Sequence, residues 1–89
     1  MSLVFVTGGS RGLGFETAKG LIKAGHQVVL FAKNEERLKS AAAELNSNYL
    51  VVDLENILQT REVFKAAIEK FGVPEILMLA HGEIGRAHV

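Results

Sequence analysis

The chain has 89 residues, enough for one small domain but too few for an enzyme with separate cofactor and substrate domains. Ten lysine and arginine residues balance ten aspartate and glutamate residues, so the charge favours neither nucleic acid nor an anionic membrane as a partner. The sequence has no cysteine, which excludes disulfides and thiolate chemistry and is typical of the reducing cytoplasm. The longest apolar runs, 28–32 and 76–80, are far below the roughly 18 residues that a membrane span needs. We therefore expect a cytoplasmic protein.

Short apolar runs alternate with longer segments of helical periodicity, a pattern typical of a parallel sheet with crossover helices. The first run ends at Thr7 before a glycine-rich loop, and Gly25 fits the left-handed position that closes the helix after it. Asn34 is the expected N-cap of the second helix, and Gly72 ends the third. The predicted strands are 3–6, 28–32, 49–52 and 76–80, and the third helix carries apolar residues at Ile57, Phe64, Ala67, Ile68 and Phe71.

These elements predict an α/β fold of the Rossmann type: a doubly wound parallel sheet in the order 3-2-1-4, with three crossover helices. Residues 1–82 form one domain in this interpretation, and residues 83–89 form an irregular tail without a further strand. A sheet of this kind normally continues beyond its fourth strand. Here the strand-four side of the sheet, meaning its edge and part of one face, would be uncovered. We therefore expect that the chain is a truncated piece of a larger protein, that it forms a homo-oligomer through this side, or both.

Gly8, Gly12 and Gly14 lie between a buried strand and a helix, where a phosphate meets free backbone N–H groups and the positive end of the helix dipole. The three glycines suit a tight turn, a close approach of the backbone to the phosphate, and a close contact of helix and strand. A glycine-rich turn that binds nothing is the alternative. A Walker-type loop would need lysine followed by serine or threonine after its last glycine, and a methyltransferase loop more often follows an acidic residue. The pattern favours dinucleotide binding by residues 1–82.

The segment 7–14, Thr-Gly-Gly-Ser-Arg-Gly-Leu-Gly, resembles the cofactor signature of the short-chain dehydrogenase/reductase family. The likeness continues at residues 33–38, 53–54 and 71–72, and it covers residues 2–82, which correspond to the amino-terminal part of such an enzyme. The resemblance implies that the loop, with Leu13 between its last two glycines, binds a nicotinamide dinucleotide. It also implies reversible interconversion of a carbonyl and an alcohol in an intact parent enzyme.

The residues after the second strand favour NADP(H) over NAD(H). An NAD site places an acidic side chain at the tip of this strand for the ribose hydroxyls, whereas a 2′-phosphate needs cations there. Ala32 stands where the NAD users of the family carry aspartate, and Lys33 follows it. Arg11 supplies a second cation with planar donors, and by resemblance Ser10 adds a hydroxyl. Simple solvation of both cations is the alternative.

By resemblance, Asp53 and Leu54 form the adenine side of the pocket, with Asp53 near the exocyclic amine; an ordinary aspartate at a helix entry is the alternative. After the fourth strand the family usually reads Asn-Asn-Ala-Gly, whereas residues 79–82 read Leu-Ala-His-Gly. Ala80 and Gly82 are candidates for this wall of the site, and only Gly82 matches in register. His81 has no partner that would make it a catalytic base, which favours a surface or spacing role.

The sequence assigns no catalytic residue and no metal site. The family uses a tyrosine followed four residues later by a lysine, but the only tyrosine, Tyr49, is followed at that spacing by Asp53. Three scattered histidines form no metal-binding pattern. We therefore expect the NADP(H)-binding amino-terminal segment of a short-chain oxidoreductase, catalytically inactive by itself. The alternative is a naturally short, non-catalytic module that binds a nucleotide or associates with itself.

Overall fold

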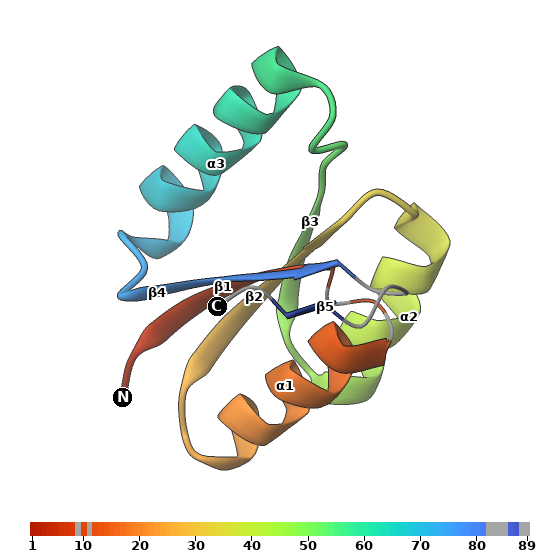
Figure 1. The fold of residues 1–89 in the computed structure, drawn as a ribbon. Coiled ribbons are helices and arrows are strands. Elements are labelled where there is room, and N and C mark those ends of the chain that lie inside the picture. Colours follow the sequence, from red (N-terminus) through yellow and green to blue (C-terminus); the bar gives the residue numbers. More distant parts are fainter. Residues whose placement is uncertain (9, 11, 82–85, 88–89) are drawn as a thin grey trace.

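The computed structural model describes residues 1–8, 10, 12–81 and 86–87. Over these residues the strands are β1 (Leu3–Thr7), β2 (Gln27–Ala32), β3 (Asn48–Val51), β4 (Ile76–His81) and β5 (Arg86–Ala87). The helices are α1 (Gly12–Lys23), α2 (Glu35–Leu45) and α3 (Ile57–Phe71). The sheet separates two helical layers, with α1 and α2 on one face and α3 on the other (Figure 1).

The strand order is β3-β2-β1-β4-β5, and β1 to β4 are parallel to one another. This confirms the predicted order 3-2-1-4. β1 is central, and Phe5 is level with Val29 of β2 and with Leu77 of β4. The chain moves outward from β1 to β3 and then returns to the opposite side of β1. The winding direction therefore reverses between β1 and β4, the position where sheets of this kind bind their ligands.

The hydrophobic core has one part on each face of the sheet, because successive side chains of a strand point to opposite faces. On the α1 and α2 side, Val4, Val6 and Leu30 are fully buried. They form one cluster with residues of both helices, among them Ala18 of α1 and Leu38 of α2. The α1 and α2 helices thus cover this face of the sheet, and their packing holds α1 against the strand that precedes the glycine loop.

The α3 side of the core is aromatic. Phe5 and Phe31 are fully buried, and Phe64 of α3 stacks on Phe31 with ring centroids 4.6 Å apart. Ile57 and Ile68 share the helical spacing of Phe64, but their exposed fractions are 76% and 40%. The buried stripe of α3 is therefore narrower than its apolar pattern indicates.

The ends of the helices follow the expected local chemistry. The side-chain oxygens of Asn34 and Asn56 cap α2 and α3, each accepting the backbone N–H of the residue three positions later at 3.0 Å. Gly25 has φ of +95° after α1, and Asn46 adopts a left-handed conformation with φ of +55° after α2. Positive φ is favourable for glycine and tolerated by asparagine, so these residues end their helices at little cost.

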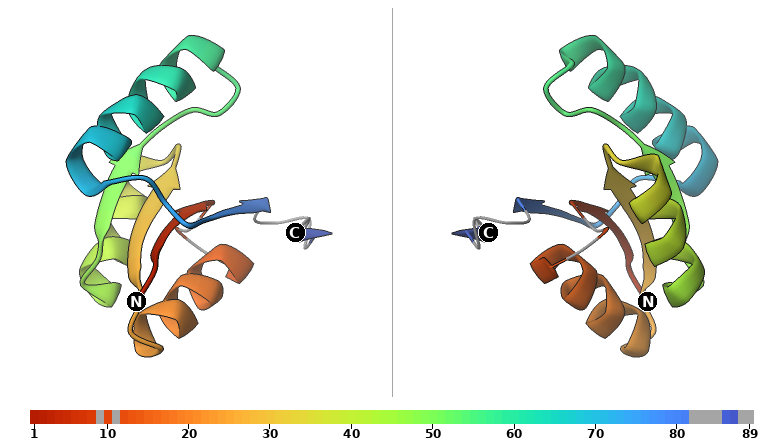
Figure 2. Two further views of the ribbon diagram at one scale, coloured as in Figure 1. Left: turned by 90° about the vertical axis from the view of Figure 1, so that its left-hand side faces the viewer. Right: turned by 90° about the vertical axis from the view of Figure 1, so that its right-hand side faces the viewer.

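The strand-four side of the sheet exposes apolar side chains. Ile76, Leu77 and Leu79 of β4 have exposed fractions of 43%, 52% and 44%. α3 lies over the β2 and β3 side, and no helix that the structure describes covers β4 on that face (Figure 2). β5 pairs with the end of β4 in the antiparallel sense, with Ala87 opposite Ala80. The sequence predicts no strand after residue 82, and β5 corrects this for residues 86–87, because a two-residue antiparallel pairing requires no apolar run. Residues 83–85 and 88–89 of the predicted tail lie outside the described residues.

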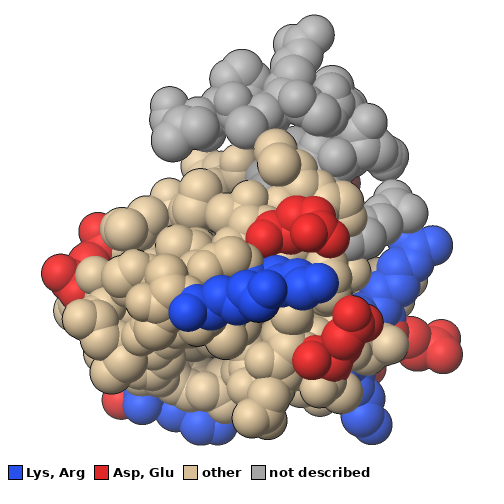
Figure 3. All heavy atoms as spheres, turned by 90° about the horizontal axis from the view of Figure 1, so that it is seen from below, with Lys and Arg blue, Asp and Glu red and all other residues tan. Residues whose placement is uncertain are grey.

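The surface carries charges of both signs. Basic and acidic side chains lie beside one another on the face shown in Figure 3. Among the described residues, no helix has both the length and the apolar character needed to cross a membrane.

Candidate functional site

The end of β1 is attached to both of its neighbouring strands at the carboxyl edge of the sheet. Thr7 is buried, and its hydroxyl donates to the Met78 carbonyl of β4 at 3.3 Å. On the other side, the Gly8 N–H donates to the Phe31 carbonyl of β2 at 2.7 Å. These two hydrogen bonds fix the point at which the glycine loop leaves the sheet.

Glycine is required at two positions of the loop. Gly8 has φ of +70° and Gly12 has φ of +61°, a region that side chains with a Cβ rarely adopt. Because the Gly8 N–H is already bonded to Phe31, Gly8 makes the turn and is not a phosphate donor. Gly9 and Arg11 lie outside the described residues.

The start of α1 has the properties of an anion-binding helix end. Its first turn contains no acidic side chain, whereas the first turn of α2 contains Glu35 and Glu36. Gly14 is buried, which brings α1 close to the sheet, and Gly12 leaves the approach to the helix without a side chain. Backbone N–H groups at this end carry the positive part of the helix dipole. The described residues of the loop therefore fit a diphosphate.

A hollow of about 550 Å³ adjoins the start of α1 and separates it from α2. Ser10 of the glycine loop lines this hollow together with Arg37 of α2, so a hydroxyl and a guanidinium are available to a ligand there. The remaining lining residues are Gly12, Phe15, Glu36, Ser40, Ala41 and Glu44. Glu36 and Glu44 add negative charge to the lining, which partly offsets the attraction of Arg37 for an anion.

Lys33 and Asp53 meet because they follow the ends of neighbouring strands. Ala32 of β2 is level with Val51 of β3, and the next residues leave the sheet together. The Lys33 Nζ lies 3.9 Å from the Asp53 Oδ2, and the exposed fractions of the two side chains are 73% and 34%. An exposed pair of this kind contributes less than about 1 kcal/mol to stability. Lys33 is therefore available to a ligand at the tip of β2, where Ala32 supplies no acid.

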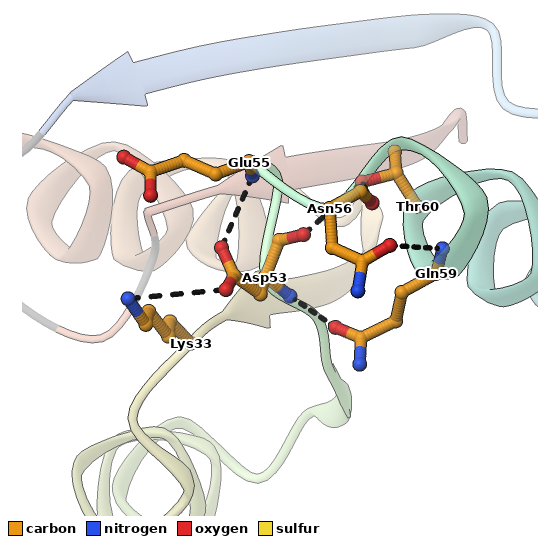
Figure 4. A network of polar contacts seen from close by, with 6 residues as sticks. All are labelled: Lys33, Asp53, Glu55, Asn56, Gln59 and Thr60. Carbon is orange, nitrogen blue, oxygen red and sulfur yellow. Dashed lines mark hydrogen bonds and ion pairs between the residues drawn. The ribbon is translucent and has the colours of Figure 1, made fainter.

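Asp53 is held in a tight turn that leads into α3 (Figure 4). Its Oδ1 accepts the Glu55 N–H at 3.0 Å, and its backbone N–H donates to the Gln59 Oε1 at 2.6 Å. Its carbonyl accepts the Asn56 N–H at 2.9 Å and the Thr60 hydroxyl at 3.3 Å. The carboxylate therefore has a fixed position beside Lys33. These contacts belong to the turn that leads into α3, and the adenine-side role of Asp53 stays a prediction.

The sequence interpretation missed the residues that hold this turn, Gln59 and Thr60. A signal for one of them is present, because Asn56 and Gln59 have the spacing of a capping box. Leu54 is predicted at the adenine side, and its side chain is 39% exposed next to Asp53. Leu13, also predicted to contact the cofactor, lies in the first turn of α1 and is 44% exposed. The other three predicted positions cannot be related to this geometry, because Arg11, Gly82 and the side chain of Ala80 lie outside the described residues.

Tyr49 and His26 make contacts that stabilise the fold. Tyr49 is half-buried in β3 and packs against the core on the α1 and α2 side, in agreement with its interpretation as a strand residue. His26 accepts the Ser2 N–H at its Nδ1, 3.0 Å away. Within the described part of the chain, histidines and carboxylates do not cluster in a way that would hold a metal ion.

A phosphate-binding loop at the switch point of a doubly wound parallel sheet defines the class of dinucleotide-binding α/β domains. Residues 2–87 match the short chain dehydrogenase family. The chain belongs to this family, as the resemblance in the loop indicates.

The chain is similar to known proteins in sequence and to solved structures in fold. The NADPH-dependent pterin aldehyde reductase of Arabidopsis thaliana is 34% identical over 87 residues, which are 93% of this chain and 36% of that protein. The NADPH-bound short chain oxidoreductase of Pseudomonas aeruginosa PAO1, which contains an atypical catalytic centre, superimposes with a TM-score of 0.81 at 32% identity. That match covers 85% of this chain and 32% of the other. The NADP complex of Pseudomonas aeruginosa RhlG gives a TM-score of 0.84 at 30% identity, covering 89% and 34%. The chain thus spans about a third of the length of these proteins.

Proposed function

We propose that this chain is the amino-terminal, NADP(H)-binding portion of a short-chain oxidoreductase. One observation carries the proposal: at the switch point of the sheet, α1 begins with Gly12 at positive φ and without an acidic side chain. When bound, the dinucleotide supplies or accepts a hydride. The residues of this chain hold it, orient it and select its form.

The diphosphate would meet the backbone N–H groups at the start of α1. Gly8 makes the turn, while Gly12 and Gly14 keep the approach open. Asp53 and Leu54 would face the adenine. The full set proposed to form the cofactor site, with Gly8 as the turn residue, is Gly8, Ser10, Arg11, Gly12, Leu13, Gly14, Ala32, Lys33, Asp53, Leu54, Ala80 and Gly82.

The residues around the tip of β2 support a preference for NADP(H) over NAD(H). Ala32 offers no carboxylate to the ribose hydroxyls, and the 73% exposed Lys33 is free to contact a 2′-phosphate. Ser10 lines the adjoining hollow, and Arg11 is its neighbour in the sequence. NADPH or NADP is also named for the three related proteins above.

The proposed reaction of the intact parent is the interconversion of a carbonyl and an alcohol in the cytoplasm. Protonation of the substrate oxygen needs a donor beside it. Tyr49 is half-buried in β3 and packs against the core, so it does not fill this role. We therefore assign cofactor binding, and no catalytic residue, to these 89 residues.

Matched glycine variants of α1 test the proposed phosphate site. NADPH is titrated against the parent chain, Gly12→Ala and Gly20→Ala. A Cβ at Gly12 disfavours the loop conformation with φ of +61° by about 1–2 kcal/mol and so lowers the population of the loop that binds; we therefore expect the affinity for NADPH to fall about tenfold. A methyl group at Gly20 has no neighbour within 4 Å, so binding should be retained. Equal affinities for NADPH in all three proteins, or no binding by the parent, would refute the proposal.

We further propose that the 89-residue chain associates with a second copy of itself through the strand-four side. Ile76, Leu77 and Leu79 are exposed there, and a net charge of zero gives little repulsion between copies. Sedimentation velocity should detect dimers or larger species in the parent chain and monomers in Leu77→Ser. A parent chain that stays monomeric at high concentration would contradict this proposal.

A further inference from the structure

We propose that Gln59 and Thr60, in the first turn of α3, are positioning residues that direct the Asp53 carboxylate toward the adenine of the cofactor. The inference rests on the proposed function and deepens it at the adenine end of the dinucleotide. Neither residue would touch the cofactor. Both would act through hydrogen bonds to the backbone of Asp53 (Figure 4).

The two residues hold the two polar backbone atoms of Asp53. The Gln59 Oε1 accepts the Asp53 N–H at 2.6 Å. The Thr60 hydroxyl lies 3.3 Å from the Asp53 carbonyl and 2.9 Å from the Asn56 carbonyl, and its single proton is shared between them. Adjacent positions of one helical turn thus fix the peptide groups on both sides of the Asp53 Cα.

The side chain of Asp53 is fixed as well. Its Oδ1 accepts the Glu55 N–H at 3.0 Å, a local turn that aspartate commonly forms. Within the described residues, the contact of Oδ2 is Lys33, whose Nζ lies 3.9 Å away. Since Oδ1 is already engaged by the turn and the ion pair with Lys33 is long and exposed, Oδ2 is the oxygen that we propose for the adenine. Its direction depends on the backbone that Gln59 and Thr60 hold.

This role is separate from capping of the helix. In the usual capping box, the side chain of the third helical residue bonds back to the N–H of the capping residue. Here the cap, Asn56, already accepts the Gln59 N–H with its own side chain, and its N–H donates to Asp53. The Gln59 side chain instead reaches three residues before the cap. Its loss would therefore change the orientation of Asp53 more than the stability of α3.

The test compares NADPH with its hypoxanthine analogue, in which an oxygen replaces the exocyclic amine of adenine. A carboxylate accepts a hydrogen bond from the amine, so the parent chain should bind NADPH about tenfold more tightly than the analogue. Gln59→Met keeps the length of the side chain and removes the acceptor, and its ratio of affinities should fall toward one. Gln59→Glu keeps an acceptor oxygen, and its ratio should stay near that of the parent chain.

A merely structural role predicts another result: Gln59→Met would weaken both ligands by the same factor and leave the ratio unchanged. That outcome, or an equally low ratio in Gln59→Glu, overturns the inference. If Gln59→Met does not fold, Thr60→Val decides the question, because it removes the hydroxyl that contacts the Asp53 carbonyl. Its ratio should fall as well, and an unchanged ratio overturns the inference.

The parent chain separates this inference from the proposed function. A parent that binds NADPH but does not discriminate against the analogue refutes the role of the Asp53 turn and leaves the proposed function in place. A parent that binds neither ligand refutes the proposed function, and this inference with it.

Discussion

Replacing Lys33 with methionine is expected to change the cofactor preference much more than the stability of the fold. Methionine has nearly the length of lysine but no charge, so the substitution removes the cation and keeps most of the apolar stem. The Lys33 Nζ lies 3.9 Å from the Asp53 Oδ2, and the lysine side chain is 73% exposed. At this separation in water, two unit charges interact by about 1 kcal/mol, and exposed pairs contribute less than this net. We therefore expect the free energy of unfolding to fall by less than about 1 kcal/mol.

The effect of Lys33→Met on the free energy of NADPH binding should be larger than its effect on the free energy of unfolding. A hydrogen bond between a charged donor and a phosphate contributes about 1.5–3 kcal/mol, so its loss should weaken NADPH binding by roughly 10- to 150-fold. NADH lacks the 2′-phosphate, and its affinity should change by less than about threefold. The preference for NADPH should then largely disappear, as measured by titration with both dinucleotides and by urea unfolding of the same samples.

Lys39→Met is the matched control, because Lys39 is an exposed lysine of α2, six positions after Lys33. Its preference for NADPH should equal that of the parent chain. The reasoning is refuted if Lys33→Met weakens NADPH and NADH by the same factor, or if Lys39→Met abolishes the preference equally.

Substitutions at three positions, Phe31, Asn46 and Gly20, test the fold. Phe31→Ala removes a fully buried ring that stacks on Phe64, so thermal unfolding should show a loss of about 3–5 kcal/mol; a loss below about 1 kcal/mol would contradict the aromatic core. Asn46→Val should lower the free energy of unfolding in urea by about 1–2 kcal/mol, because φ is +55° there, whereas Asn46→Gly should be neutral or stabilising; equal effects would contradict the left-handed cap. Gly20→Ala should raise the melting temperature through a gain of up to about 1 kcal/mol, since the added methyl group meets no atom within 4 Å, and a lower melting temperature would contradict this geometry.

Much of the fold can be predicted from the sequence because local and long-range signals agree. The buried runs at β1 and β2 alternate with helices whose ends are marked by Asn34 and Gly25, and right-handed crossovers leave few ways to order the strands. The exposure of Ile57 cannot be predicted this way. It depends on the position of α3 over the sheet, which the spacing of apolar residues in one helix does not encode.

The candidate site likewise has features that the sequence predicts and features that depend on the folded structure. The glycine loop is recognisable because its residue types are required by backbone geometry, as the positive φ of Gly8 and Gly12 demonstrates. Capture of the Gly8 N–H by Phe31 depends on the register of β1 and β2, which the motif does not specify. The contacts of Gln59 with Asp53 likewise follow from the path of the turn before α3. Sequence reasoning finds the residues that a loop requires, but it misses partners that meet only through folding.

The most direct test of the account is an amide NMR titration of the parent chain with NADPH. We predict saturable shifts of the Gly12, Leu13 and Gly14 N–H signals at the start of α1. Gly72, which follows α3 at the opposite edge of the sheet, should not move. Unchanged signals for all three residues of α1 while NADPH binds, or shifts confined to the edge near Gly72, would contradict the assignment of this helix end as the phosphate site.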